Sequence, residues 1–472
     1  MQDFALDIAG RRLTTAQRIE IRNPHSGETV GATYFAGADE LEAGVRAAVA
    51  GFERTRRLAT HERARILGGI AGRLRERREE FARSITGENG KPIKESRGEV
   101  DRAVSTFAVA AEEAKRIPGE MLPLDWQVGS EGRWGIVRRF PAGPVLAFTP
   151  FNFPLNLCAH KVAPALAAGC SIFLKPAPGT PLTALRLGEA VREAGAPEGA
   201  CTVVPCANEL AAGLVRDGRF AVFTFTGSSR VGWELRAQAG RKRVLLELGG
   251  NAALIVHADA DLDAAVRRTL VGGFAYSGQV CISVQRVYAH RAVFDTFVAR
   301  LVDGVRALKA GDPFDETVSV SSLIRPGEAE RVHAWIAEAQ AGGARVLVGG
   351  GRRGSLVEPT VLTGTRPEMK VVGEEVFGPL VVVEPYDDLD AALAAVNAGR
   401  YGLQAGIYTH DLRAAWKAFE TLEVGAVMVN EVPTYRVDHM PYGGVKDSGL
   451  GREGVRYAIE EMTEPRMLML NP

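Results

Sequence analysis

Short apolar runs alternate with helical stretches through most of this chain, starting near residue 143. We expect the first runs to be strands, and they lie at residues 145–148, 171–174, 201–204, 221–225 and 244–248. They are continuously apolar and do not alternate with polar residues, which is typical of strands buried on both faces. This order predicts an α/β fold with a doubly wound, parallel sheet that carries helices on both faces.

Helix signals lie between and before these strands. Helices are expected over residues 154–168 and from about Ser228, and Thr180 and Asn208 are expected to cap two more. Residues 52–83 predict an amphipathic helix or helix pair over a core, with its apolar stripe at Ile66, Leu67, Ile70 and Leu74.

A second cycle of strands and helices follows. Strands are expected at 254–256, 284–289, 346–348, 380–383, 406–408 and 426–429, and helices at 261–275, 292–307, 326–341 and 389–398. This predicts a second α/β domain. The stretch 121–140 indicates a protruding hairpin, and residues 464–470 indicate a strand that can pair with a partner.

The composition excludes several classes of function. Lysine plus arginine number 57, as do aspartate plus glutamate, so zero net charge gives no reason to expect nucleic acid or an anionic membrane as partner. No apolar stretch approaches the roughly 20 residues of a membrane span, and the start does not resemble a signal peptide. The five cysteines are scattered without a CxxC pair, so we expect no metal site and a reducing, cytoplasmic setting.

Three polar groups stand out near the ends of apolar runs. Cys281 closes the small, polar segment Tyr276–Cys281, Glu247 ends an apolar strand, and Asn152 lies between aromatic residues and prolines. A thiol, a carboxylate and an amide can attack a carbonyl, activate water and hold an oxyanion. Taken singly, each has a structural alternative: a small buried hydrophobe, a carboxylate held by backbone amides, and a helix cap.

Two further segments suit a phosphate-bearing ligand. Phe225–Gly232 turns from a strand through Gly227 into a helix that begins with serines, so its free amides can bind a phosphate. Its glycine spacing differs from the usual dinucleotide pattern, and an ordinary capped helix stays an alternative. Lys175 follows a strand and can bond ribose hydroxyls or a phosphate, although a surface lysine is the plainer interpretation.

In combination, these segments resemble the motifs of the aldehyde dehydrogenase superfamily. The matching segments, in chain order, are Pro150–Pro154, Phe225–Gly232, Glu247–Gly250, Gly278–Cys281, Glu375–Pro379 and Pro441–Gly449. The match extends over essentially the whole chain. Within the superfamily, the chain looks like the lactaldehyde and phosphonoacetaldehyde dehydrogenases, a non-acylating branch.

The resemblance implies a reaction and a role for each residue. Cys281 is the nucleophile that adds to an aldehyde, Asn152 holds the oxyanion, and Glu247 activates the water that releases the acid. The implied cofactor-binding residues are Lys175, Thr226, Gly227, Ser228, Glu375 and Phe377. NAD is the first choice, but NADP stays open because Pro178 stands where many NAD-preferring relatives carry a ribose-binding glutamate.

The resemblance also divides the chain and implies self-association. Residues 1–117 and 139–249 are expected to form a Rossmann-type dinucleotide-binding domain, and residues 250–455 a catalytic domain. Residues 118–138 and 456–472 are expected to form a β arm through which a homodimer or homotetramer assembles.

Four basic side chains suggest the substrate class. Arg286, His160, Arg102 and Arg436 are candidates for binding a short polar or anionic aldehyde, because arginine can grip a carboxylate or phosphonate with two parallel bonds. The alternative is that these arginines pair with carboxylates of the protein. A CoA-acylating semialdehyde dehydrogenase is the alternative function, and the presence of Glu247 argues against it. An inactive binding protein and a cysteine hydrolase are weaker rivals.

Overall fold

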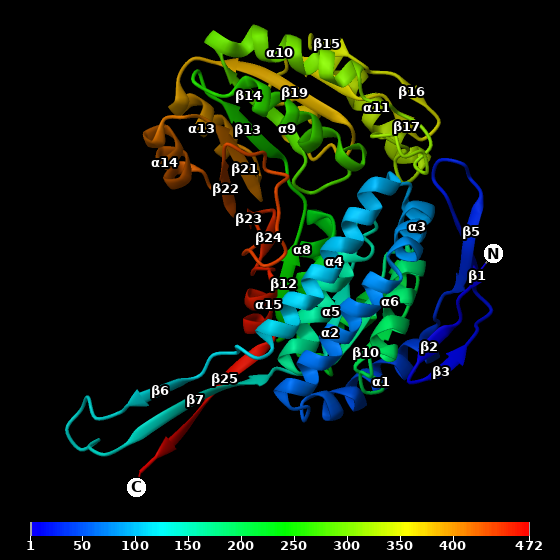
Figure 1. Cartoon of the computed structure of the whole chain (residues 1–472), viewed down its shortest axis with the longest axis vertical. Coiled ribbons are helices and arrows are strands. Elements are labelled where there is room, and N and C mark those ends of the chain that lie inside the picture. The colour runs from blue at the N-terminus through cyan, green and yellow to red at the C-terminus, as the bar shows by residue number, and fades with distance from the viewer. Residues whose placement is uncertain (1, 472) are drawn as a thin grey trace.

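Two large sheets organise the molecule, each covered by helices, and a β arm projects from one of them (Figure 1). The computed structural model describes residues 2–471. The predicted α/β fold class is confirmed. In the part of the chain that the structure describes, no helix is both long enough and apolar enough to cross a membrane.

The first sheet has six strands. Their order is β10 (Cys201–Val203), β9 (Ile172–Lys175), β8 (Val145–Phe148), β11 (Val222–Thr226), β12 (Arg243–Glu247) and β24 (Gly449–Leu450). All neighbours are parallel except β24, which is antiparallel to β12. The parallel strands match the predicted ones to within one residue at each end. β24 was not predicted, and it joins this sheet from a part of the sequence that we expected in the second domain.

Alternate residues of the strands enter two separate cores, which explains their continuously apolar sequence. In β8, Val145 and Ala147 pack into one core, whereas Leu146 and Phe148 pack into the other. The first core includes the predicted stripe Ile66, Leu67, Ile70 and Leu74. The helices on that side are α2 (Thr60–Glu76), α3 (Arg78–Asn89), α4 (Ile93–Glu113), α5 (Asn156–Ala168) and α6 (Pro181–Glu193). The helices on the other side are α1 (Ala38–Thr55), α7 (Asn208–Arg216) and α8 (Ser229–Gln238).

The second sheet has seven strands. Their order is β15 (Arg345–Val348), β18 (Thr360–Thr363), β19 (Leu380–Tyr386), β14 (Val284–His290), β13 (Ala252–Val256), β21 (Gln404–Tyr408) and β22 (Ala426–Val429). Only β15 runs antiparallel to its neighbour. The helices of this part are α9 (Leu262–Phe274), α10 (Arg291–Arg306), α11 (Pro326–Ala341), α12 (Lys370–Gly373), α13 (Leu389–Asn397) and α14 (Leu412–Thr421). The second α/β unit is therefore confirmed, although β18 was not predicted.

Several short elements also lie outside the predictions. They are β1 (Gln2–Asp3), β2 (Leu6–Ile8), β3 (Arg11–Leu13), β4 (Arg18–Arg22), β5 (Thr29–Tyr34), β16 (Arg352–Arg353), β17 (Leu356–Val357), β20 (Tyr401–Gly402), β23 (Val445–Lys446) and α15 (Val455–Glu461). Most are strands of two or three residues, which are too short to give a periodic signal. Their pairing depends on neighbours that are distant in the sequence, such as β20 with β23.

Neither expected capping side chain makes a capping hydrogen bond, although Thr180 does hold the N-cap position of α6. Thr180 makes no capping bond at α6; instead the buried Glu88 carboxylate accepts the amide hydrogens of Leu182 and Thr183 over 2.9 and 3.1 Å. Asn208 lies inside α7, which begins after Ala207, and its side-chain oxygen accepts from Lys175 Nζ over 2.7 Å. A carboxylate at a helix amino terminus satisfies free amides as well as a local cap does.

The projecting arm is a three-stranded sheet in the order β25 (Thr463–Leu470), β7 (Trp134–Pro141) and β6 (Glu120–Pro123). The predicted hairpin and C-terminal strand are therefore confirmed as strands, and they pair with each other within one chain. The arm extends away from the two bodies (Figure 1). It exposes many large apolar side chains: Met121, Trp126, Val128, Trp134, Ile136, Met467, Leu468, Met469 and Leu470.

Candidate active site

Three neighbouring strands bring predicted groups to one edge of the first sheet. Asn152 follows β8, Thr226 ends β11, and Glu247 ends β12 directly opposite Thr226 in the parallel register. Cys281 approaches from the second sheet, in the loop between the 3₁₀ turn η1 (Ala275–Gly278) and β14. The carboxyl edge of an open parallel sheet is where ligands of such folds bind.

Left-handed backbone marks the approach to Cys281. Tyr276, Ser277 and Gly278 have φ angles of 45°, 55° and 72°. For the two residues that carry side chains, this costs on the order of 1–3 kcal/mol each. A Cβ at Gly278 would lie 2.0 Å from the carbonyl oxygen of Gly378, so the close approach requires glycine. The chain therefore holds this loop in a strained form.

Buried hydrogen bonds hold the strained loop in place. The Tyr276 hydroxyl donates to the Asn89 carbonyl over 3.0 Å, and the Ser277 hydroxyl donates to the Ser321 carbonyl over 2.7 Å. The Ser321 amide donates back to the Ser277 hydroxyl over 2.9 Å. Asn89 ends α3 of the first unit, whereas Ser321 belongs to the second. Both units therefore position Cys281.

The Cys281 thiol is only partly exposed, and its sulfur lies 2.9 Å from the Tyr442 hydroxyl. Burial raises the pKa of this thiol to about 11, although the bond with Tyr442 acts in the opposite direction. Little thiolate is therefore present near neutral pH in the free protein, and reactivity depends on groups that favour the anion.

Glu247 is a buried carboxylate without a hydrogen-bond partner among the described residues. Its side chain is 3% exposed, and neither oxygen is bonded. Burial raises the pKa of Glu247 well above its ordinary value, and the nearby Glu453 carboxylate raises it further. A Cβ at Gly443 would lie 2.9 Å from Glu247 Oε1, so the adjacent backbone leaves room for the carboxylate only because it is glycine. Such a group is a candidate general base.

Asn152 joins the edge of the first sheet to the loop that carries Cys281. Its amide nitrogen donates to the Gln279 carbonyl over 3.0 Å, and its oxygen has no partner among the described residues. The side chain is buried, and Gln279 lies two residues before Cys281. Because the amide carries two N–H groups, one donor remains for an oxyanion formed at the cysteine.

Polar groups of the first sheet meet where a dinucleotide can bind. Lys175 ends β9, is buried, and uses Nζ to contact Asn208; burial lowers the pKa of this lysine. The hydroxyls of Thr226 and Ser229 are buried without partners among the described residues. Ser228, predicted to bind the pyrophosphate, is exposed and immediately precedes α8. Ser229 lies in the segment predicted to bind a phosphate, but only Thr226, Gly227 and Ser228 were named there as cofactor-binding residues.

Glu375 and Phe377 lie on the side of the second sheet. Glu375 Oε1 accepts from the Gly250 amide over 2.9 Å, and burial raises the pKa of this carboxyl to about 7. Its other oxygen lies 2.3 Å from where a Cβ of Gly249 would stand. Phe377 has a φ of 51° and packs edge-to-face on Phe151 with ring centroids 5.9 Å apart. These residues, with Gly250, line a small hollow beside the loop of Cys281.

These features fit a nicotinamide dinucleotide. Unpartnered buried hydroxyls at the start of a helix can donate to phosphate oxygens, and a lysine with a carboxylate can bond ribose hydroxyls. At Gly227, a Cβ would lie 2.5 Å from the Phe225 ring, so this turn has no room for a side chain at that position. No cluster of three or more histidine, cysteine, aspartate or glutamate residues in the described chain is placed to hold a metal ion.

A buried carboxylate gathers two of the predicted substrate residues. Asp438 accepts from Arg102 Nη2 over 2.8 Å, from His160 Nε2 over 2.8 Å and from the Asn156 amide over 3.1 Å. Burial opposes ionisation of Asp438, but His160 and Arg102 outweigh it and lower the pKa of the carboxyl. Burial, and then Arg436, lower the pKa of His160. Arg102 therefore pairs with a protein carboxylate, as the alternative predicted, but only its Nε and Nη2 contact Asp438, and the side chain stays 32% exposed.

Arg436 packs against Tyr442, the tyrosine that contacts Cys281. Its Nη2 donates to Glu453 over 3.1 Å, and its guanidinium stands 3.6 Å from the centroid of the Tyr442 ring. The side chain is buried, yet its Nε has no partner among the described residues. Glu453 also accepts from Lys161 over 3.2 Å. Arg436 therefore retains a donor inside the site.

Arg286 does not lie with these groups. It is in β14, and its guanidinium donates to the backbone carbonyls of Ala395 and Asn251 over 3.2 and 3.0 Å. These bonds tie elements of the second sheet together. Among the described residues, these backbone carbonyls and the Tyr288 hydroxyl are the hydrogen-bond partners of the Arg286 guanidinium, so the structure gives no support for its expected role at the substrate.

No role was predicted for Tyr442, Asp438, Glu453 or Lys161, which the structure places in the same buried network. Tyr442 lies in the segment Pro441–Gly449, and Lys161 lies on the helix that carries His160, so both stood inside segments already singled out. Asp438 and Glu453 gave no local signal, because only the fold brings them together.

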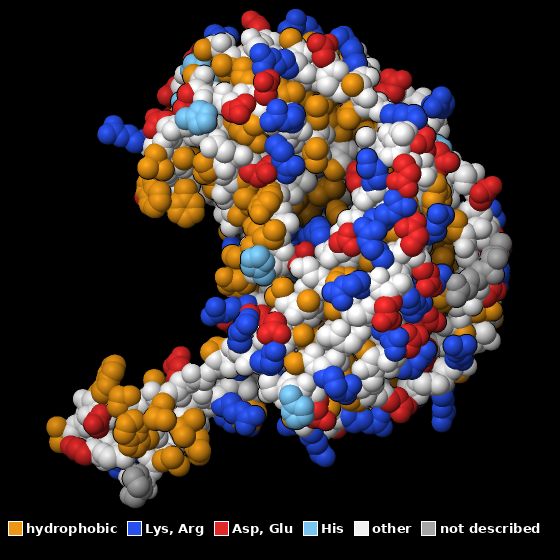
Figure 2. Space-filling model, viewed as in Figure 1, with side chains coloured by type: hydrophobic (Ala, Val, Ile, Leu, Met, Phe, Trp, Pro, Cys, Tyr) orange, Lys and Arg blue, Asp and Glu red, His pale blue; other side chains and the backbone are white. Residues whose placement is uncertain are grey.

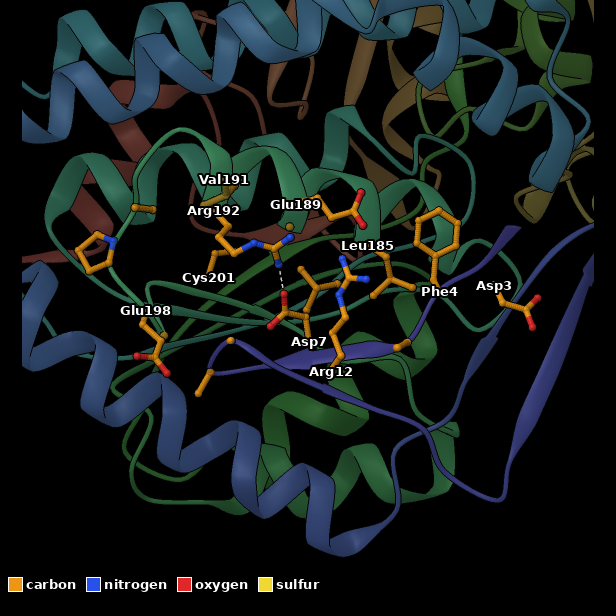
Figure 3. Close-up of a pocket in the computed structure, with 18 residues that line it drawn as sticks. Asp3, Phe4, Asp7, Arg12, Leu185, Glu189, Val191, Arg192, Glu198 and Cys201 are labelled. Carbon is orange, nitrogen blue, oxygen red and sulfur yellow. Dashed lines mark hydrogen bonds and ion pairs between the residues drawn. The ribbon is translucent and has the colours of Figure 1, made fainter. Parts of the chain in front are cut away.

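A larger cavity, of about 470 Å³, lies elsewhere (Figure 3). It is lined by the amino-terminal segment, α6 and the loop before β10, and the Arg192–Asp7 ion pair crosses it. Among its lining residues, Cys201 is the only cysteine, and burial raises its pKa to about 12. None of the predicted site residues lines this cavity.

Comparisons with known proteins agree with this arrangement. Residues 12–468 match the family model described as the aldehyde dehydrogenase family. The 3-sulfolactaldehyde dehydrogenase of Priestia megaterium is 45% identical over 472 residues, which cover 100% of this chain and 98% of that protein.

Solved structures are similar over the same length. Aldehyde dehydrogenase 21 from Physcomitrella patens, in complex with the reaction product succinate, superposes with a TM-score of 0.97 at 42% identity, covering 99% of this chain and 98% of that one. The glyceraldehyde-3-phosphate dehydrogenase GapN of Methanocaldococcus jannaschii, complexed with NADP, gives 0.92 at 36% identity, covering 96% and 98%.

The raised thiol pKa predicts a steep pH dependence for the reactivity of Cys281. Because the thiolate fraction rises with pH below the pKa, alkylation by iodoacetamide should accelerate about tenfold per pH unit between roughly pH 7 and 9. The folded protein, freed of cofactor, is alkylated, and mass spectrometry of the Cys281 peptide measures the rate. A plateau reached below about pH 8 would contradict the raised pKa.

Proposed function

Because this chain belongs to the aldehyde dehydrogenase family, we propose that its substrate is a small aldehyde with an anionic end group, oxidised to the acid with NAD or NADP. The observation that carries this proposal is the convergence of a thiol, a carboxylate and an amide beside a buried arginine with a free donor. Cys281, Glu247, Asn152 and Arg436 provide these groups.

Cys281 performs the first chemical step. Its thiolate adds to the carbonyl carbon, so a C–S bond forms and the electron pair of the C=O double bond moves to oxygen. The second N–H of the Asn152 amide and the backbone N–H of Cys281 are the donors that suit this oxyanion. The product on Cys281 is a thiohemiacetal, which releases hydride more readily than the free aldehyde does. As the hydride leaves, the oxyanion electrons re-form the C=O bond, and a thioester remains on Cys281.

The groups that would hold the cofactor are Lys175, Thr226, Ser229 and Glu375, with Phe377 beside the ring. A bound nicotinamide supplies the acceptor for hydride. Position 178 carries proline, so no carboxylate at that point repels a phosphate on the ribose. The site therefore accommodates both NAD and NADP, and NAD remains the first choice.

Glu247 completes the reaction. A carboxylate without hydrogen bonds is free to take a proton from water, whose oxygen then attacks the thioester carbon on Cys281. The C–S bond breaks, the acid leaves, and the thiolate is restored. This hydrolytic step argues against the CoA-acylating alternative, in which CoA would take the place of water.

Two arginines support an anionic substrate. Arg102 uses Nε and Nη2 on Asp438, at 3.3 and 2.8 Å, and its side chain keeps 32% of its exposure. Arg436 keeps an unpartnered Nε. The names of the compared proteins mention a sulfonated aldehyde, succinate and a phosphorylated aldehyde, each of which bears an anion away from the reacting carbon. A carboxylate, sulfonate or phosphate end group suits the same donors.

Glu247→Gln should separate hydride transfer from hydrolysis. We expect one equivalent of reduced nicotinamide in a rapid burst, followed by a steady rate lowered on the order of 10²-fold, because the amide cannot take a proton from water. Stopped-flow absorbance measures both phases, and mass spectrometry should detect an acyl group on Cys281.

Cys281→Ala is the control for this experiment, and it should give no burst. Addition of CoA to the wild-type protein should leave the free acid as the product. Steady turnover of the Glu247→Gln variant at the wild-type rate would exclude Glu247 as the base, and a CoA thioester as product would favour the acylating alternative.

Arg102→Met should discriminate between anionic and neutral aldehydes. Loss of a charged hydrogen bond is worth about 1.5–3 kcal/mol, so kcat/KM for succinic semialdehyde should fall roughly tenfold to hundredfold. For propanal, which has no anionic group, kcat/KM should fall by less than about twofold. Steady-state kinetics with both aldehydes measure the ratio.

The matched control is Arg78→Met, which removes another arginine paired with an aspartate, Asp101, on the surface of α3. The Arg78→Met variant should keep the wild-type kcat/KM for both succinic semialdehyde and propanal. Equal losses for succinic semialdehyde and propanal in the Arg102 variant would contradict anion recognition by this residue.

Self-association is the remaining part of the proposal. Apolar side chains gather on the arm and also over α14, where Leu412, Trp416 and Phe419 are 77%, 59% and 60% exposed (Figure 2). Exposed apolar surface of this extent is typical of an interface. A second copy of the chain, packed on the arm, would bury these apolar side chains in a dimer or tetramer.

The free state of the five cysteines also suits the predicted reducing, cytoplasmic setting.

Charges on the arm should therefore dissociate the protein. We expect light scattering to give a dimer or tetramer mass for the wild type and a monomer mass for the variant with Leu468→Lys and Leu470→Lys, because buried lysines lack partners. Arg57→Glu, a charge change at an exposed residue just after α1, is the control and should keep the assembly. A wild-type monomer at micromolar concentration would contradict the proposal.

A further inference from the structure

The hydroxyl of Tyr442 is buried against a reactive sulfur. The residue is 3% exposed, and its oxygen lies 2.9 Å from Cys281 Sγ. Within the described residues, this sulfur is the hydrogen-bond partner of the hydroxyl. A phenylalanine would fill the same apolar surroundings, which include Val280, Ile282 and Leu403, without a polar group to satisfy. The oxygen therefore has a use that packing alone does not explain.

The ionisation of Cys281 fixes the direction of this bond. With a neutral thiol either partner can donate, but a thiolate only accepts, so the Tyr442 hydroxyl must then be the donor. Burial raises the pKa of Tyr442 well above its usual value, and the phenol keeps its proton. The bond therefore becomes charge-assisted when the sulfur ionises, and such bonds are about twice as strong as neutral ones.

The backbone pins the tyrosine in this position. The Tyr442 amide donates to the Glu453 carbonyl over 3.0 Å, and the Glu453 amide donates to the Tyr442 carbonyl over 2.6 Å. The Arg436 guanidinium stands over the ring, 3.6 Å from its centroid. A cation on the ring face draws electron density from the phenol and makes its hydroxyl a stronger donor. The positive charge also attracts the thiolate directly.

The charged groups around the sulfur act in both directions. Glu247 and Glu375 disfavour the thiolate, as does burial, whereas Tyr442 and Arg436 favour it. Removal of either favourable group should therefore leave the thiol more strongly protonated. Of the two, only Tyr442 touches the sulfur.

We propose that Tyr442 is a catalytic residue whose hydroxyl donates a hydrogen bond to the Cys281 thiolate. This bond orients the sulfur and increases the fraction of Cys281 that is thiolate, and the Arg436 guanidinium on the Tyr442 ring strengthens the donor. No proton passes from Tyr442 to sulfur. This inference rests on the proposed function, because it assigns a task within the first step at Cys281.

Tyr442→Phe removes the donor and keeps the ring. We expect alkylation of Cys281 by iodoacetamide to be about tenfold slower at pH 8, with the rising limb of the pH profile displaced by about one unit to higher pH. The folded protein is alkylated without aldehyde or cofactor, and mass spectrometry of the Cys281 peptide then measures the extent of reaction. In turnover, kcat should fall while KM for the aldehyde stays within about twofold, since the lost interaction serves the nucleophile.

Two further proteins make the result decisive. Tyr386→Phe removes another buried hydroxyl, which contacts His257 over 2.6 Å at the far end of β19, and it should keep the wild-type alkylation profile. Replacement of Tyr442 by 3-fluorotyrosine supplies a more acidic phenol and should displace the profile in the opposite direction. This second change remains informative if the phenylalanine variant does not fold.

Identical alkylation profiles for wild type and Tyr442→Phe would overturn the proposal, as would a rise in KM alone, which would make Tyr442 a substrate contact. Because the alkylation requires no aldehyde, the two proposals fail separately. A displaced profile in a protein that oxidises none of the tested aldehydes would keep the role of Tyr442 and reject the proposed function.

Discussion

The strained loop before Cys281 depends on hydrogen bonds from both halves of the molecule. Left-handed backbone at Tyr276 and Ser277 is unfavourable in isolation, and bonds to Asn89 on one side and Ser321 on the other offset its cost. Asn152 adds a third tie, through the Gln279 carbonyl. The sulfur can therefore occupy its position only when the two sheets are in their native arrangement, so a cysteine elsewhere on either sheet would not reproduce this site.

A similar dependence governs the charges. Two carboxylates, Glu247 and Glu453, lie in one buried region, but their surroundings differ. Glu453 bonds to Lys161 and Arg436, which together with His160 outweigh its burial and lower its pKa. Glu247 has no hydrogen-bond partner among the described residues, and burial raises its pKa. Paired groups whose surroundings separate their pKa values are a usual basis for acid and base roles. Here the carboxylate that lacks partners is the one suited to take a proton.

Local sequence patterns predicted the elements whose burial is continuous, and they failed where pairing is remote. The strands of the first sheet were found because both faces of each are apolar, as Val145 to Phe148 illustrate. β24 was missed because its two residues join β12 from about two hundred residues away in the sequence. The error over Arg286 has the opposite origin. Closeness in sequence to Cys281 suggested a place in the site, but in the structure the Arg286 guanidinium donates to the backbone carbonyls of Ala395 and Asn251.

The sequence by itself determined the alternating α/β order, the arm and the identities of the thiol, amide and carboxylate, because each of these is written in local runs or short motifs. Only the tertiary structure decided which groups touch. It paired Tyr442 with Cys281 and both Arg102 and His160 with Asp438, and it gave Glu247 no hydrogen-bond partner within residues 2–471. The physical reason is that hydrogen bonds and pKa values depend on distances of a few ångströms between distant segments, and only packing fixes these distances.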